Sequence, residues 1–144
     1  MSAFVHLRLH TEYSLRDSVV RIPELVTRVA ELDMPAVAVT DQNNLFAMVK
    51  FYRKALEHGV KPLVGVDLLI AEAGERSEPS RLSLLCMNEA GYRNLTGLVS
   101  RAYLEGQLRG VPRVEREWLT PESTRGLIAL SCAGDGDVGR ALAG

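Results

Sequence analysis

Two kinds of apolar pattern alternate along the chain, and this alternation constrains the fold more than any other feature. Residues 36–40 (Ala-Val-Ala-Val-Thr) form a short continuous apolar run, typical of a strand buried between two layers. In residues 22–32 and 45–58, apolar residues recur every three or four positions, as on one face of a helix. Further strand-like runs lie at 4–9, 63–71, 82–87 and 126–131, and further helical patterns at 88–104, 120–122 (a helix start) and 137–142. Alternating strands and helices predict an α/β fold with a largely parallel sheet.

Local signals at the segment ends predict where helices start and stop. Pro23 suits the first turn of a helix, and Pro35 ends it because the residue before a proline is disfavoured in the α conformation. Asn43 and Asn44 predict the N-cap of the second helix, with Leu45, Met48, Val49 and Tyr52 as its apolar stripe. Residues 72–80 are rich in Gly, Glu, Ser and Pro, which predicts an exposed loop.

Composition excludes several classes of protein. The 144 residues carry 17 Lys and Arg against 18 Asp and Glu, so no overall basic surface indicates nucleic-acid binding. No apolar run approaches the roughly 20 residues that span a bilayer, so we expect no membrane association. Cys86 and Cys132 are too few for a disulfide framework and predict free thiols in the reducing cytoplasm.

The number of strands bears on domain organisation. About five strands are visible, whereas a closed parallel β/α barrel usually needs roughly 200 or more residues. We therefore expect residues 1–144 to be a piece of a longer chain. A free-standing small-molecule binding domain is the alternative, and it predicts that these residues fold cooperatively as a monomer.

Polar residues follow the predicted strands where α/β proteins gather their ligands, at the carboxyl ends. His10, Asp17, Asp41 and Asp67 occupy such positions and are plausible ligands for Zn²⁺ or Mn²⁺, which would activate water against a phosphoester. The alternative is structural: an Asp after a buried strand commonly accepts backbone N–H bonds, and His10 can be hydrogen-bonded without a metal. Arg101, Arg109, Arg113 and Arg116 are interleaved with glutamates, which favours a solvated, charge-balanced face.

Several segments together resemble the PHP (polymerase and histidinol phosphatase) domain at the amino terminus of bacterial DNA polymerase III alpha subunits. They are residues 4–17, 34–41, 45–52, 61–65, 88–95, 100–103 and 126–131, in order and with similar spacing. The resemblance covers essentially the whole chain. It implies that residues 1–144 are the N-terminal part of a PHP domain, a distorted β/α barrel with metal ligands around the carboxyl ends of its strands.

The family's metal motifs are only partly present. His10 and Asp17 match the end of the first motif, and Asp67 places a carboxylate where the third motif has Glu. Three ligand positions are substituted: Arg8 stands for the first His of His-x-His, Gln42 for the His of Thr-Asp-His, and Arg81 for a later His. Ser131-Cys132-Ala133 stands where metal-bearing members have Ser-Gly-Cys. Arg8 is a permanent cation that repels a metal and could pair with Asp17 or Asp67, which predicts a degenerate site.

The resemblance also implies a function. The parent chain would be a DNA-directed DNA polymerase that uses Mg²⁺ and contacts DNA through its other domains. This region, without a cofactor of its own, would dock the proofreading exonuclease subunit, alongside other replicase subunits. The alternative is an active phosphoesterase or 3′ exonuclease that holds Zn²⁺ or Mn²⁺ on His10, Asp17 and Asp67.

Overall fold

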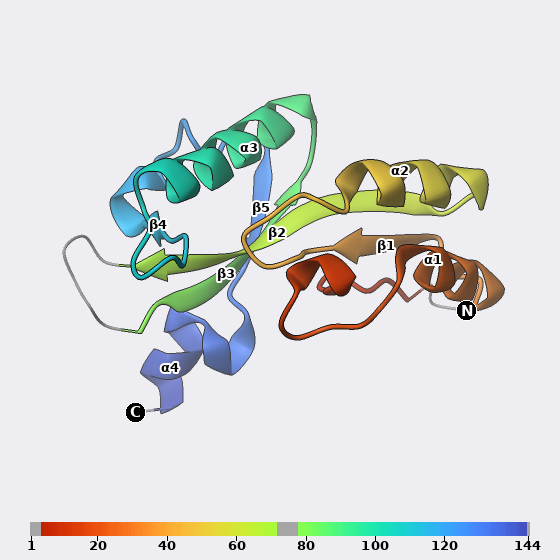
Figure 1. The fold of residues 1–144 in the computed structure, drawn as a ribbon, viewed down its shortest axis with the longest axis horizontal. Coiled ribbons are helices and arrows are strands. Elements are labelled where there is room, and N and C mark those ends of the chain that lie inside the picture. Colours follow the sequence, from red (N-terminus) through yellow and green to blue (C-terminus); the bar gives the residue numbers. More distant parts are fainter. Residues whose placement is uncertain (1–3, 72–77, 144) are drawn as a thin grey trace. The chain divides into compact units, whose positions relative to one another are not determined.

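The computed structural model describes residues 4–71 and 78–143, which form two compact units (Figure 1). The first unit ends at Val66 and the second begins at Asp67, inside a long strand. Most of the predicted loop at 72–80 lies outside the described residues. None of the helices in the described ranges combines the length and the apolarity that a bilayer crossing demands.

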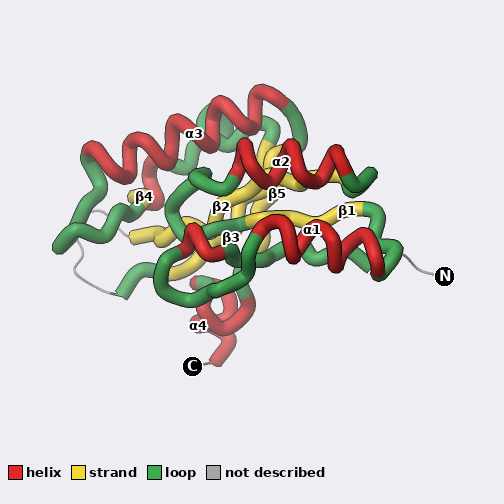
Figure 2. The backbone as a smooth tube through the Cα atoms, turned by 45° about the vertical axis from the view of Figure 1, so that its right-hand side comes forward, coloured by secondary structure: helices red, strands yellow, loops and turns green. Residues whose placement is uncertain are grey.

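The first unit packs two helices against a pair of parallel strands. Its elements are η1 (Glu12–Ser14), α1 (Ile22–Glu31), β1 (Ala36–Val39), α2 (Met48–Glu57) and the first part of β2 (Lys61–Ala71). β1 pairs with β2 in parallel, so that Ala36 lies opposite Lys61 and Val39 opposite Val64. The helices α1 and α2 run alongside β1 (Figure 2), and the core is Ile22, Val26, Val29, Val37, Val39, Ala47, Phe51, Ala55 and Val60.

The ends of α1 confirm the local signals. Pro23 lies in its first turn, where its missing N–H costs no helical hydrogen bond. At the other end Asp33 adopts a left-handed conformation with φ 52°, and the chain leaves the helix before Pro35. β1 follows and is buried along its whole length, as predicted.

The prediction that Asn43 and Asn44 cap the second helix is wrong. α2 begins at Met48, and its N-cap is Ala47. Asn44 is committed elsewhere, because its amide group donates to the carbonyl oxygens of Tyr13 (2.9 Å) and Gln42 (3.1 Å). These contacts hold the chain after β1 in an irregular loop and delay the start of the helix.

The buried face of α2 also differs from the predicted stripe. Ala47, Phe51 and Ala55 are buried, whereas Val49 and Tyr52 are exposed. Both sets recur at helical spacing, so the period alone does not say which set meets the strands.

The first predicted strand, at residues 4–9, makes only a single β-bridge instead of a continuous strand pairing. His6 makes a single parallel bridge with Val37, and Phe4 and Leu7 are exposed. The carbonyl oxygens of His6 and Leu9 accept hydrogen bonds from Ala38 and Thr40, both at 2.8 Å. The segment therefore lies beside β1, but its apolar side chains are not buried alternately.

The second unit combines the rest of β2 with three further strands. Its other elements are β3 (Ser80–Cys86), α3 (Glu89–Leu104), β4 (Val114–Glu115), η2 (Arg116–Trp118), β5 (Leu127–Leu130), η3 (Ala133–Asp135) and α4 (Asp137–Ala143). β3 lies between β2 and β5 in the sheet, and α3 packs on β3, β4 and β5. Asn88 caps α3 as predicted, since its side chain accepts from the Gly91 N–H.

Strand pairing in the second unit is mixed. β4 pairs with β2 in parallel, whereas β5 pairs with β3 in an antiparallel manner. β5 forms where the strand-like run at 126–131 lies, and its Ile128 and Ala129 are exposed. Within the described residues β5 pairs only with β3, so it is an edge strand. The predicted helix start at Thr120 is instead a turn, in which the hydroxyl of Ser123 donates to the Trp118 carbonyl oxygen (2.6 Å).

The two faces of α2 give a test of the first unit's packing. Phe51 is 1% exposed and Val49 is 57% exposed. We expect Phe51→Ala to lower the free energy of unfolding by about 3 to 5 kcal/mol, because it leaves a cavity in the core. Val49→Ala on the same helix should change it by less than about 0.5 kcal/mol. Urea unfolding followed by circular dichroism measures both, and equal losses would contradict the observed helix orientation.

Candidate functional site

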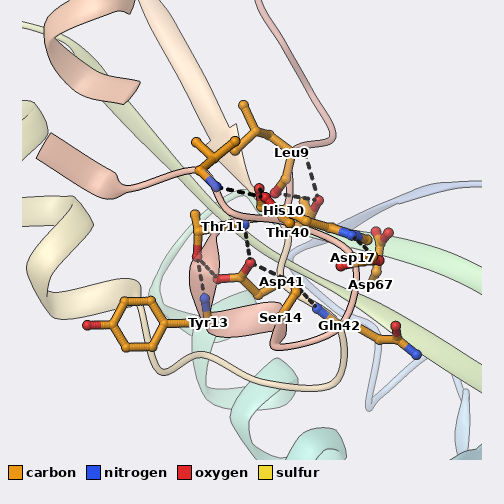
Figure 3. A network of polar contacts seen from close by, with 12 residues as sticks. Leu9, His10, Thr11, Tyr13, Ser14, Asp17, Thr40, Asp41, Gln42 and Asp67 are labelled. Carbon is orange, nitrogen blue, oxygen red and sulfur yellow. Dashed lines mark hydrogen bonds and ion pairs between the residues drawn. The ribbon is translucent and has the colours of Figure 1, made fainter. Parts of the chain in front are cut away.

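A buried carboxylate joins the loop after the first extended segment to the loop after β1. Asp41 directly follows β1 and Thr40, and it is 1% exposed. Its Oδ1 accepts hydrogen bonds from the Thr11 N–H (2.5 Å) and the Ser14 hydroxyl (2.8 Å), and its Oδ2 accepts from the Thr11 hydroxyl at 2.7 Å (Figure 3). Three donors from residues 27 to 30 positions away converge on this one side chain.

Further hydrogen bonds reinforce this connection on both sides of Asp41. The Ser14 hydroxyl also accepts from the Gln42 N–H at 3.1 Å. The Thr40 hydroxyl accepts from the Leu9 N–H at 3.1 Å. The loop that starts at His10 is therefore held by both side-chain and backbone contacts.

This geometry favours the structural role for Asp41 over the metal role. The carboxylate is occupied by N–H and O–H donors, as the structural alternative predicted. Its partners lie in a distant loop and not in its own turn, which the sequence pattern did not indicate. Thr11 and Ser14 were also missed, although two small hydroxyl residues just after His10 were an available signal.

His10 and Asp17 lie together in the first unit. The His10 Nδ1 is 2.8 Å from Asp17 Oδ2, and the two side chains are 13% and 34% exposed. The Ser18 hydroxyl donates to the His10 carbonyl oxygen at 2.7 Å. The structure thus brings two of the candidate ligands into direct contact with one another.

Asp67 belongs to the second unit, where it has a partner that sequence analysis missed. Asp67 is buried, and the hydroxyl of the fully buried Ser83 donates to its Oδ1. The Ser83 Oγ is also 3.0 Å from the Cys132 Sγ. A serine within the apolar run of β3 was the available signal, because a buried hydroxyl needs a polar partner.

The two cysteines are free thiols in different surroundings. Cys132 has a left-handed backbone, with φ 57°. Cys86 ends β3, and burial raises the pKa of its thiol to about 11. The Cys86 thiol is therefore protonated at neutral pH.

The resemblance marks Arg8, Gln42 and Arg81 as substituted ligand positions, and the structure shows the surroundings of each. Arg8 is exposed and permanently cationic, and Arg81 is half-buried in β3. Gln42 is half-buried and has a neutral amide side chain, and its backbone N–H donates a hydrogen bond to the Ser14 hydroxyl oxygen. None of the three supplies an imidazole or carboxylate donor.

The structure brings two of the candidate metal ligands together within the first unit. His10 and Asp17 are two donors that already contact each other, whereas zinc sites use at least three protein ligands. Over residues 4–71 and 78–143, no group of three or more His, Cys, Asp or Glu side chains is arranged to hold a metal ion.

The arginine-rich stretch of the second unit is partly neutralised. Arg101 contacts Glu105 at 2.8 Å and lies 4.0 Å from the centre of the Trp118 ring. Arg116 contacts Asp137 at 2.8 Å, and this hydrogen bond lowers the pKa of the Asp137 carboxyl. Arg101 is thus paired with one of the interleaved glutamates, as the sequence predicts, whereas the partner of Arg116 lies in α4 and the Arg113 Nε is buried.

The Asp41 contacts predict a graded loss of stability. Asp41→Ala removes all three acceptor contacts and should cost about 3 to 5 kcal/mol of unfolding free energy, because buried donors lose their partner. Asp41→Asn keeps one acceptor oxygen without the charge and should cost about 1 to 3 kcal/mol.

Asp33→Asn is the matched control, since Asp33 is exposed and asparagine tolerates its left-handed backbone. It should change stability by less than about 0.5 kcal/mol in the same denaturation measurement. Equal effects at Asp41 and Asp33 would show that the buried contacts are not stabilising.

Comparisons with known proteins agree with this architecture. The sequence profile of the PHP domain matches residues 6–144. Proteins named DNA polymerase III subunit alpha are 52% identical in Pseudomonas fluorescens (99% of this chain), 54% in Pseudomonas aeruginosa (97%) and 44% in Escherichia coli K12 (96%). The chain spans only 12% of the length of each of these relatives.

Two solved structures share the fold at low sequence identity. An amidohydrolase from Chromobacterium violaceum superposes with a TM-score of 0.54 at 18% identity, over 70% of this chain and 34% of its own. A candidate metal-dependent phosphoesterase from Bifidobacterium adolescentis also gives 0.54, at 13% identity, over 72% of this chain and 34% of its own. The expected fold class, α/β and part of a PHP-type barrel, is confirmed. The chain belongs to the PHP domain family.

Proposed function

We propose that this region is the N-terminal PHP portion of a replicative DNA polymerase alpha subunit, and that it serves as a structural and docking module for the proofreading exonuclease. The observation that carries the first part is the identity of 52% and 54%, over nearly the whole chain, to proteins named DNA polymerase III subunit alpha. Template-directed DNA synthesis with Mg²⁺ then belongs to the rest of the parent chain, as do its contacts with DNA. The free thiols of Cys86 and Cys132 suit a cytoplasmic location.

The chemistry of the former ligand positions supports a docking role over catalysis. Arg8 places a fixed positive charge where the family pattern has a metal-binding histidine, and a cation there raises the energy of a bound metal ion. The Asp41 carboxylate already accepts three hydrogen bonds, so the loop needs no metal to hold it. A module with an ordered loop and no metal can still present a surface to a partner.

The docking role is tested with the full-length alpha subunit and its purified exonuclease subunit. We expect the intact pair to form a stable complex, and an alpha subunit lacking this region to bind the exonuclease at least about tenfold more weakly. Surface plasmon resonance measures the affinity, and primer extension by the truncated chain checks that the polymerase domains are folded. Undiminished exonuclease binding by an active truncated chain would refute the proposal.

A metal-dependent phosphoesterase or 3′ exonuclease is the second candidate, favoured by the pairing of His10 with Asp17 and by the fold shared with a candidate phosphoesterase. Metal analysis of the full-length chain, purified without chelator and dialysed against trace Zn²⁺ and Mn²⁺, separates the two functions. Our proposal predicts no tightly held metal in this region. Two or three bound ions that are lost in His10→Ala, together with metal-stimulated phosphoesterase turnover, would establish the second candidate instead.

A further inference from the structure

The loop between η1 and α1 exposes more apolar surface than its surroundings require. In Figure 1 it leaves η1 and returns to the start of α1 at the surface of the first unit. Leu15 is 81% exposed and Val19 is 90% exposed, and Val20 is also exposed. Two apolar side chains of this loop are therefore turned largely to solvent, and a third is partly exposed.

The backbone of this loop is unusual at the same place. Leu15 has φ 67°, a left-handed conformation that residues other than Gly, Asn and Asp rarely adopt. It follows the last residue of η1, where Gly or Asn would be the unstrained choice. A strained backbone that carries an exposed leucine is unfavourable for folding on both counts, which points to a use outside the fold.

The loop is nevertheless held in place. The Glu12 N–H donates to the Val20 carbonyl oxygen at 2.9 Å, and the Val20 N–H donates to the Ser18 hydroxyl at 3.1 Å. Asp17 and Ser18 in turn contact His10 at 2.8 and 2.7 Å. These bonds fix the middle of the loop, so a partner would meet the apolar side chains already ordered.

The charge of the loop indicates the chemistry of its partner. Arg16 and Arg21 are exposed and form no ion pair with any residue in the described ranges, whereas Asp17 is paired with His10. The loop therefore presents apolar side chains flanked by two free cations. Apolar residues bordered by arginine are common at protein interfaces, and the loop has no aromatic side chain on which a base could stack.

We propose that residues 15–21 form a docking loop for a protein segment in which apolar side chains are flanked by carboxylates. The inference rests on the proposed function, so the partner is that segment of the proofreading exonuclease. Leu15 and Val19 supply the apolar contact, and Arg16 and Arg21 pair with the carboxylates. The apolar contact gives most of the affinity, and the arginines give its salt dependence.

The test measures exonuclease affinity for variants of the full-length alpha subunit by surface plasmon resonance. Leu15→Asn combined with Val19→Ser should weaken binding about tenfold or more, and asparagine suits the left-handed position, so the fold should be kept. Arg16→Glu with Arg21→Glu should weaken binding most at low salt and invert its salt dependence, because the new glutamates repel the partner's carboxylates and salt screens that repulsion. Val49→Ser with Leu56→Ser is the matched control, since these α2 side chains are 57% and 59% exposed, and it should bind within about twofold of the parent.

The outcomes separate this inference from the proposed function. Wild-type affinity in both loop variants, with binding lost when the whole region is removed, would keep the docking role and overturn the assignment of the loop. An equal loss in the α2 control would also overturn it. A charge-reversal variant that weakens primer–template binding but not exonuclease binding would make the loop a nucleic-acid contact and refute the proposal. Full affinity without the whole region would refute the proposed function itself.

Discussion

The contacts of Asp41 hold together the loop after the first extended segment and the loop after β1. A carboxylate excluded from water is costly unless donors surround it, and here an N–H and two hydroxyl groups do so. All three donors come from the segment after the first extended stretch, so the burial of Asp41 and the shape of that segment depend on each other. Residues 15–21, for which we propose a docking role, begin directly after Ser14 at the end of this segment.

This arrangement explains how the loop geometry can be independent of a metal. The donors to Asp41 are Thr11 and Ser14, and neither contact involves the side chain at position 8 or 42. Arginine and glutamine can therefore occupy those two positions without removing the hydrogen bonds that shape the loop.

Local sequence patterns predicted the helix ends and the buried strand correctly where these depend on residues close together in the chain. α1 begins beside Pro23 and ends before Pro35, β1 is the continuous apolar run that was expected, and Asn88 caps α3 through a residue three positions away. Each of these features depends on neighbours within one helical turn or on burial along a whole strand. The contact between His10 and Asp17, seven residues apart, was not predicted, although both residues were singled out as candidate ligands.

The sequence by itself determined the alternation of strands and helices, the family, and the residue types at the ligand positions, because these follow from order along the chain. Only the tertiary structure decided which face of α2 is buried, since Phe51 and Val49 are both apolar and both recur at helical spacing. It also decided that Asp41 accepts from residues 27 and 30 positions away and Asp67 from a residue 16 positions away. Two apolar stripes on one helix look alike in the sequence, and only packing against distant segments decides which of them is buried. The same packing brings hydrogen-bond donors to the buried carboxylates.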